Sequence, residues 1–169
     1  MCIRDSWCML SGKINDKLYT TLLPAQDFAR AHNWYSLHGT PSEQVQILIY
    51  LARSYATDGD YEKAMATYTN ALEIARKNEL NNSLGYVYSY MGDLYETQAM
   101  MEQAISKYQS ATYFFKNAEN TKSYACALRD RGRGYARTDS IERAIEILLK
   151  AESIATNLED KNVKATIDN

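Results

Sequence analysis

Small and bulky apolar residues recur at helical spacing along residues 48–71. A first group lies at i, i+3, i+4 and i+7 and a second at i, i+3, i+7 and i+10, and each spacing marks one face of an α-helix. The members are Leu48, Leu51, Ala52 and Tyr55, then Tyr61, Ala64, Tyr68 and Ala71. Gly59 lies between the groups and can take the left-handed conformation that ends a helix. Because the connection is short, the pattern predicts two antiparallel helices.

The same spacing returns twice at intervals of forty residues, in 88–111 and 128–151. The columns include small residues where we expect the two helices of each pair to approach most closely, and tyrosines beside them. These columns are Ala52, Gly92 and Gly132; Tyr55, Tyr95 and Tyr135; and Ala64, Ala104 and Ala144. A fixed period of this size indicates stacked repeats that share one apolar core. The chain is therefore predicted to be all-α, an α-solenoid of stacked antiparallel helix pairs.

These columns resemble the tetratricopeptide repeat, and the run Gly-Asp-Tyr-Glu-Lys-Ala at 59–64 is close to the consensus sequence of that family. The resemblance implies a right-handed solenoid in which the first helix of each repeat lines a concave groove. The usual period is about 34 residues, so each copy here carries about six more. Arg76 also stands near the place of the family's closing proline. We expect these departures to change the curvature and to leave the fold class unchanged.

The columns divide the chain into six parts. These are a leader at 1–12 that is artefactual or the remnant of a preceding helix, a degenerate unit with one helix at 13–40, repeats at 41–80, 81–120 and 121–160, and the truncated start of a further helix at 161–169. Ser42 is expected to cap the first repeat helix, and Asn157 to end the last one. Ala99 lies in a turn, 97–100, that offers no good helix terminator.

The segment ahead of the repeats reads as one helix, with Pro24 at a first helical position and Gly39 and Pro41 at its end. The run Trp-Tyr-Ser-Leu-His-Gly-Thr-Pro at 34–41 resembles a subgroup of bacterial envelope-associated proteins with such repeats. Members often carry a lipoprotein signal before the repeats and a membrane helix, a coiled coil or a DNA-binding module after them. The sequence shows none of these parts, so the compartment stays open between the envelope and the cytoplasm.

Composition and charge exclude several classes of partner. The chain is 46% apolar and 24% charged, which is ordinary for a soluble globular protein. Its formal charge of −2 gives no electrostatic reason to expect nucleic acid or an anionic membrane as the partner of this segment. No run of eighteen apolar residues exists, so the sequence predicts no membrane span.

The residues that carry chemistry form no recognisable site. The three cysteines, Cys2, Cys8 and Cys126, include no CxxC pair, and His32 and His38 lack a partner at a metal-ligand spacing. The glycines form no phosphate loop, and no motif combines a nucleophile with a base. We therefore expect no catalysis, no cofactor and no metal.

The remaining candidate for a functional site is a binding surface formed by exposed side chains. The family resemblance places Arg53, Tyr86, Asp93 and three further arginines in the concave groove, and Tyr90 is a tyrosine that the packing columns do not need. The three arginines are Arg129, Arg133 and Arg137. They are four residues apart and form one row along a helix. Guanidinium groups in such a row could bind an acidic segment, or Arg129 or Arg133 could pair with Asp93 or Glu96 and leave a solvated face. Tyr86 and Tyr90 could anchor a partner or only pack.

Two functions follow, and the first is favoured. The first is a scaffold without catalysis that binds a protein or peptide partner in the concave groove, as a fragment of a larger sensor or regulatory protein. The second is an architectural spacer, or a module that associates with itself through uncapped ends. Ile147, Leu148 and Ile154 are expected to be partly bare at such an end.

Overall fold

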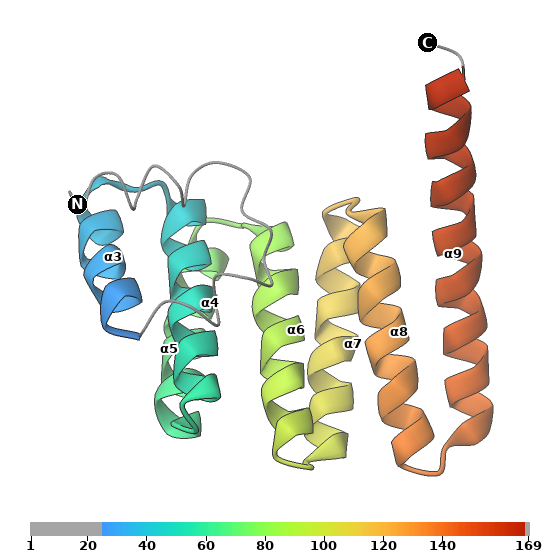
Figure 1. The fold of residues 1–169 in the computed structure, drawn as a ribbon, viewed down its shortest axis with the longest axis horizontal. Helices are drawn as coiled ribbons and strands as arrows, with labels where there is room; N and C mark the ends of the chain where they lie inside the picture. The colour runs from blue at the N-terminus through green and yellow to red at the C-terminus, as the bar shows by residue number, and fades with distance from the viewer. Residues whose placement is uncertain (1–24, 168–169) are drawn as a thin grey trace. The chain divides into compact units, whose positions relative to one another are not determined.

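The computed structural model describes residues 25–167 of the chain, with side chains as far as Leu158 (Figure 1). Its helices are α3 (Ala25–His38), α4 (Pro41–Thr57), α5 (Tyr61–Lys77), α6 (Asn81–Thr97), α7 (Met101–Asn117), α8 (Thr121–Arg137) and α9 (Ile141–Ile167). Residues 25–167 contain no strand, which confirms the predicted all-α repeat fold. The predicted leader at 1–12 and Pro24 lie outside the described residues.

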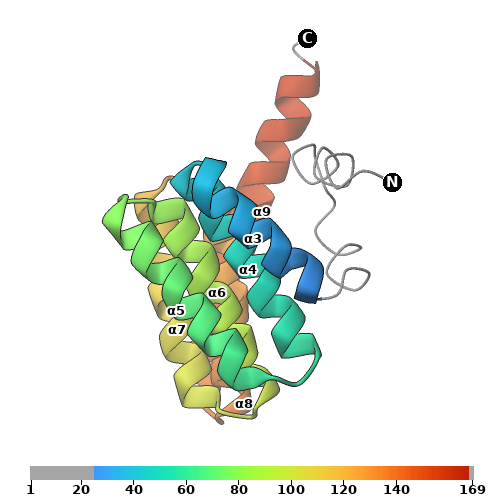
Figure 2. The same cartoon turned by 90° about the vertical axis from the view of Figure 1, so that its left-hand side faces the viewer.

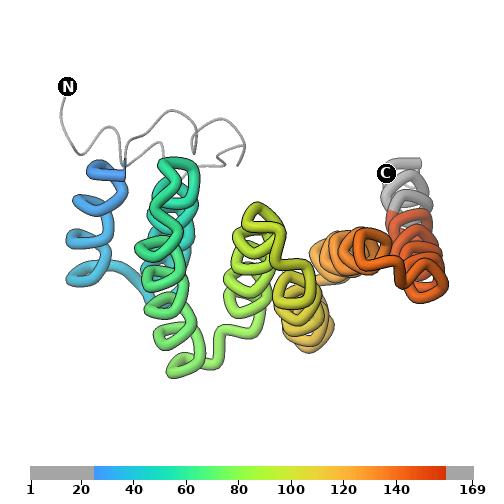
Figure 3. Tube along the Cα trace, turned by 90° about the horizontal axis from the view of Figure 1, so that it is seen from below, coloured from blue at the N-terminus to red at the C-terminus, as the bar shows by residue number. Residues whose placement is uncertain are grey.

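The helices form two compact units, divided after Asn78. In the first unit, α4 packs against both α3 and α5 (Figure 2). In the second, α6 packs on α7, α7 on α8 and α8 on α9, so that each helix lies beside its neighbour in sequence (Figure 3). None of the helices within residues 25–167 combines the length and the apolar character that crossing a membrane requires.

The helices from α4 to α8 have the same length, 17 residues, and three residues connect each to the next helix. Two helices and two connections therefore account for the forty-residue interval. The residue with positive φ recurs at the same place in the connections, as Gly59, Glu79, Ala99, Glu119 and Asp139. The forty residues of each interval are thus divided equally between two helices of one length and their connections.

Hydrogen bonds explain why a connection without glycine still ends its helix. After α4, the N–H of Asp60 donates to the carbonyl of Tyr55 at 2.9 Å, and the N–H of Gly59 donates to Ala56 at 3.2 Å. This is the Schellman pattern of helix termination. The connection after α6 repeats it, since Met100 donates to Tyr95 at 2.9 Å and Ala99 to Glu96 at 3.0 Å. Backbone bonds therefore end α6 at Thr97 although Ala99 must adopt φ 58°.

Ala99→Gly is expected to raise the free energy of unfolding by roughly 1 kcal/mol, because the left-handed conformation costs a residue with a β-carbon about that much. Urea denaturation followed by circular dichroism measures the change. Ser106→Gly in the exposed interior of α7 is the matched control and is expected to lower stability by about 0.5–1 kcal/mol. A loss of stability in Ala99→Gly would contradict the role assigned to this turn.

The N-terminus of α4 begins two residues earlier than expected. Thr40, and not Ser42, is the N-cap: its hydroxyl accepts the N–H of Glu43 at 3.3 Å, and the Glu43 carboxylate accepts the N–H of Thr40 at 2.8 Å. This capping box, followed by Pro41 in the first turn, determines the start of the helix. The pKa of Glu43 is lowered, because the backbone N–H and the hydroxyl of Thr40 both donate to its carboxylate.

The C-terminal helix also differs from its expected end. α9 runs without a break from Ile141 to Ile167, so residues 161–167 continue this helix and do not begin a further one. The sequence between these bounds contains no glycine or proline that could end a helix. Ile147, Leu148 and Ile154 are half-buried, as expected.

Small residues allow the paired helices to approach closely. Ala52, Ala64 and Ala104 are fully buried, and Ala144 nearly so. A β-carbon added at Gly92 would lie 2.5 Å from Cε1 of Tyr108, so the absence of a side chain there makes room for a ring of α7. The corresponding place at Gly132 is taken by Leu148, with the backbone oxygen of Ala144 at 3.5 Å from the added atom. Tyr55, Tyr95 and Tyr135 are half-buried beside these contacts.

Arg131 stands in a column that holds Leu51 and Met91 in the other copies. Its side chain is half-buried, and the guanidinium carbon lies 5.6 Å from the centre of the Tyr135 ring. A guanidinium over an aromatic face is attracted by the ring's negative surface. The arginine therefore takes the place of an apolar residue by packing its stem and stacking its head.

Candidate functional site

The three arginines of the predicted row lie along α8 and are half exposed. Their side-chain exposures are 56% for Arg129 and 50% for both Arg133 and Arg137. The spacing of four residues places them on one helix face, as the sequence predicts. All three nonetheless contact carboxylates, and these contacts decide what the row can do.

Glu96 on α6 forms ion pairs with two of the three arginines. Nη2 of Arg133 lies 3.3 Å from Oε1 of Glu96, and Nη1 of Arg137 donates to the same oxygen. The Glu96 side chain is only 16% exposed, whereas both guanidiniums remain half in solvent. The pairs link α8 to α6, the first helices of two successive hairpins.

Tyr108 on α7 donates a hydrogen bond to the other oxygen of the Glu96 carboxylate. Its hydroxyl lies 2.8 Å from Oε2 of Glu96 and 2.7 Å from Oδ1 of Asp93, and it donates toward both. The Tyr108 residue is 1% exposed. Burial raises the pKa of this phenol well above its usual range, and the negative charge of Asp93 and the hydrogen bonds to both carboxylates raise it further. The phenol therefore stays protonated and acts as a donor.

Asp130 completes the cluster. Its Oδ1 accepts hydrogen bonds from Nη2 and Nε of Arg129 at 2.9 and 3.0 Å and lies 3.5 Å from Nη1 of Arg133. The hydrogen bond that Arg129 donates to Asp130 is the main cause that raises the pKa of Arg129. The cluster thus contains three guanidiniums and three carboxylates, those of Asp93, Glu96 and Asp130, and it carries no net charge. We call these six residues with Tyr108 the α6–α8 network.

The tyrosines and Arg53 have different surroundings. The Tyr86 hydroxyl lies 3.0 Å from Oγ of Ser123, and its ring packs edge to face on Phe115 at 4.9 Å, so this side chain joins α6 to α7 and α8. Tyr90 is half-buried on α6. Arg53 is half-buried on α4 in the first unit, so the structure does not bring it together with the network.

Sequence reasoning missed the central residue of the network. Tyr108 occupies a packing column with Tyr68 and Leu148, and we predict only core packing for it. A signal was available, because a fully buried tyrosine usually finds a hydrogen-bond partner for its hydroxyl. Among the described side chains, no three His, Cys, Asp or Glu residues gather as a metal-ligand set.

Comparisons with known proteins agree with this repeat architecture. Residues 43–117 match the family model described as tetratricopeptide repeat. No curated protein matches the chain. Among solved structures, the crystal structure of BtubC (BKLC) from P. vanneervenii is similar, with a TM-score of 0.70 and 17% identity over 80% of this chain. The match covers 56% of that protein, so this chain spans little more than half its length, and the likeness shows the fold alone. The family match and the helix pairs together support tetratricopeptide repeats in residues 43–117.

Proposed function

We propose that this chain is a protein-interaction scaffold without catalysis of its own, which binds an acidic segment of a partner protein along the arginine row of α8. Tetratricopeptide repeats generally mediate contacts between proteins, and this supports the general class. The observation that carries the finer proposal is the half exposure of three guanidiniums on one helix face. Guanidinium groups bind carboxylates through paired hydrogen bonds, which gives such a row its preference for acidic chains.

The network determines how such a ligand would bind. Because Glu96 and Asp130 already neutralise the arginines, an acidic segment has to compete with them or add carboxylates on the exposed side of the same guanidiniums. Half-exposed ion pairs contribute little to stability, typically about 0–1 kcal/mol. Exchange of Glu96 itself costs more, because its side chain is only 16% exposed and its carboxylate would be left against the Tyr108 hydroxyl. Added carboxylates on the exposed side of the guanidiniums are therefore the favoured mode.

A second candidate function, an architectural spacer, is favoured by the same contacts. Glu96 pairs with Arg133 and Arg137 of the next hairpin and accepts a hydrogen bond from the Tyr108 hydroxyl. Such pairing could serve only to keep α6 and α8 in register. In that case the arginines would have no ligand beyond the chain itself.

Glu96→Gln separates the two candidates. If the row binds acidic partners, this change frees two guanidiniums and is expected to strengthen binding of a deca-glutamate peptide by about three- to tenfold, the equivalent of about 1 kcal/mol. Arg133→Glu with Arg137→Glu is expected to abolish that binding. Isothermal titration at low salt measures both, with deca-glutamine as the uncharged control peptide.

The matched control variant is Lys116→Glu with Arg143→Glu, which changes the net charge by the same amount at exposed positions outside the network. It is expected to retain most of the binding. If neither the parent nor Glu96→Gln binds deca-glutamate, and Glu96→Gln only lowers the melting temperature, the groove proposal is wrong and the spacer is supported.

A further inference from the structure

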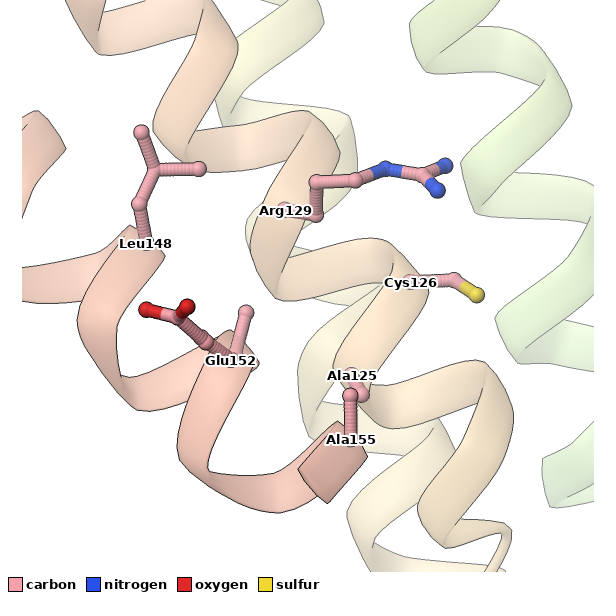
Figure 4. Close-up of a pocket in the computed structure, with 7 residues that line it drawn as sticks. Ala125, Cys126, Arg129, Leu148, Glu152 and Ala155 are labelled. Carbon is pink, nitrogen blue, oxygen red and sulfur yellow. The ribbon is translucent and has the colours of Figure 1, made fainter. Parts of the chain in front are cut away.

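A pocket of about 370 Å³ lies between α8 and α9, and it shares Arg129 with the α6–α8 network. Figure 4 shows Ala125 of α8 facing Ala155 of α9, with Leu148 and Glu152 on the α9 side. Cys126 and Arg129 also line the pocket, and in this view both side chains extend away from α9. The wall of the pocket is mainly apolar. A closed apolar cavity of about 150 Å³ is already large enough to take a benzene ring.

The pocket exists because two facing columns are both small in the last hairpin only. In the second hairpin the corresponding residues are Gly85 and Phe115, and a β-carbon added at Gly85 would lie 2.6 Å from the Phe115 ring. Phe115 is 2% exposed there. In the first hairpin the columns hold Val45 and Ala75. In each earlier copy one residue is larger than alanine, whereas Ala125 and Ala155 leave the space between them unfilled.

A second column holds a smaller side chain in the last hairpin, although it is filled, because Leu148 lies against Gly132. Leu148 stands where Tyr108 fills the space between α6 and α7. The last hairpin therefore lacks the rings of both Phe115 and Tyr108. The unfilled space between Ala125 and Ala155 corresponds to an aromatic side chain that this hairpin does not supply.

The apolar surface continues along α9 beside the pocket. Ile145 is 53% exposed, whereas its counterpart Ile105 is 8% exposed. Ile105 is covered by α8, where a β-carbon added at Gly134 would lie 2.7 Å from Cγ1 of Ile105. Leu149 is 59% exposed in a column that holds Thr69 and Gln109 in the other copies. The surface of α7 that corresponds to Ile145 is therefore covered by another α-helix, α8, which has the small residue Gly134 at the contact.

Charge at the rim narrows the chemistry of the occupant. Arg129, which lines the pocket, is paired with Asp130. Glu152 is exposed at the edge of the pocket, and no ion pair between described side chains involves it. A basic residue next to the entering aromatic side chain would complement Glu152.

We propose that the α8–α9 pocket, together with Ile145 and Leu149, is a second docking surface, and that its occupant is an amphipathic helix of a partner protein. The helix inserts one aromatic side chain between Ala125 and Ala155 and presents a basic residue to Glu152. This inference rests on the proposed scaffold function and extends it to a second surface, which shares Arg129 with the arginine row but does not include Arg133 or Arg137.

The test uses the whole chain and a helical peptide of alanine and lysine, about as long as α8, with one central phenylalanine. The parent is expected to bind this peptide at least about tenfold more tightly than a peptide with alanine in place of the phenylalanine, as measured by fluorescence anisotropy. A peptide with glutamate in place of its lysines is expected to bind more weakly than the lysine peptide.

Two variants fill the pocket from within. Ala125→Gly with Ala155→Phe reproduces the Gly85–Phe115 pair, and Ala125→Val reproduces the Val45–Ala75 pair. Both are expected to remove the preference for phenylalanine while keeping the helical circular dichroism of the parent. Ser153→Phe, an exposed site on α9 outside the pocket lining, is the matched control and is expected to bind like the parent.

Equal binding of the phenylalanine and alanine peptides, or parent-like binding by both filled variants, would overturn the proposal. The proposal would also be overturned if the parent sediments as a dimer and both filled variants sediment as monomers. The occupant would then be a second copy of the chain. Arg133→Glu with Arg137→Glu is expected to leave peptide docking intact. Failure of the pocket and failure of the arginine row are thus observed separately.

Discussion

Tyr108→Ala is expected to lower the free energy of unfolding by about 3–5 kcal/mol, the usual cost of removing a buried aromatic ring. The ring is 1% exposed and fills the space that Gly92 leaves open. Its hydroxyl also holds Asp93 and Glu96. The variant therefore creates a cavity and releases both carboxylates at once. Urea denaturation followed by circular dichroism measures the loss.

Tyr108→Phe separates the ring from the hydroxyl. It keeps the packing and removes only the donor, so we expect a smaller loss of about 1–3 kcal/mol. Tyr113→Ala is the matched control, because Tyr113 lies on the same helix and is 62% exposed. A loss at Tyr108→Ala no larger than that at Tyr113→Ala would show that the Tyr108 ring does not organise this hairpin.

Gly92→Leu is expected to lower the free energy of unfolding by about 1–3 kcal/mol, because a side chain at this position is forced into the Tyr108 ring. Even the first added carbon would lie 2.5 Å from Cε1 of Tyr108. Thermal and urea unfolding measure the effect, and Gly92→Ala is expected to be intermediate.

The direction of this result is informative, since replacing glycine in a helix normally gains about 0.8–1 kcal/mol in helix propensity. A net loss therefore reports the close contact between α6 and α7. Ser106→Leu, at an exposed place on α7, controls for the added apolar side chain. Stability equal to the parent in Gly92→Leu would contradict the assignment of the small columns.

The sequence predicts the helices and their pairing well because size and spacing repeat. Ala52, Ala64 and Ala104 could be assigned to the helix contacts from three copies of one pattern, and all are buried. The ends of the helices are harder to predict from the sequence, because they depend on local hydrogen bonds. Thr40 and not Ser42 caps α4, and backbone bonds end α6 at a turn whose Ala99 gave no signal in the sequence.

The candidate site could be predicted only in part. Periodicity places Arg133 and Glu96 on the faces of their helices, and their pairing was one of two alternatives. Which rotamers the side chains adopt depends on contacts among three helices, and no spacing encodes them. Tyr108 shows this, because its column is apolar by spacing while its hydroxyl joins two carboxylates. The resemblance to envelope-associated proteins stays a prediction.

The uniform length of the helices has a consequence for how this protein can change. Each helix with its connection takes twenty residues, and the positive-φ position recurs at that interval from Gly59 to Asp139. Duplication or loss of a forty-residue segment would join one turn to an equivalent turn and keep every later apolar position on its face. An insertion of one residue inside a helix would instead turn all the following side chains by about 100°. Variation in length among related chains is therefore expected in whole units.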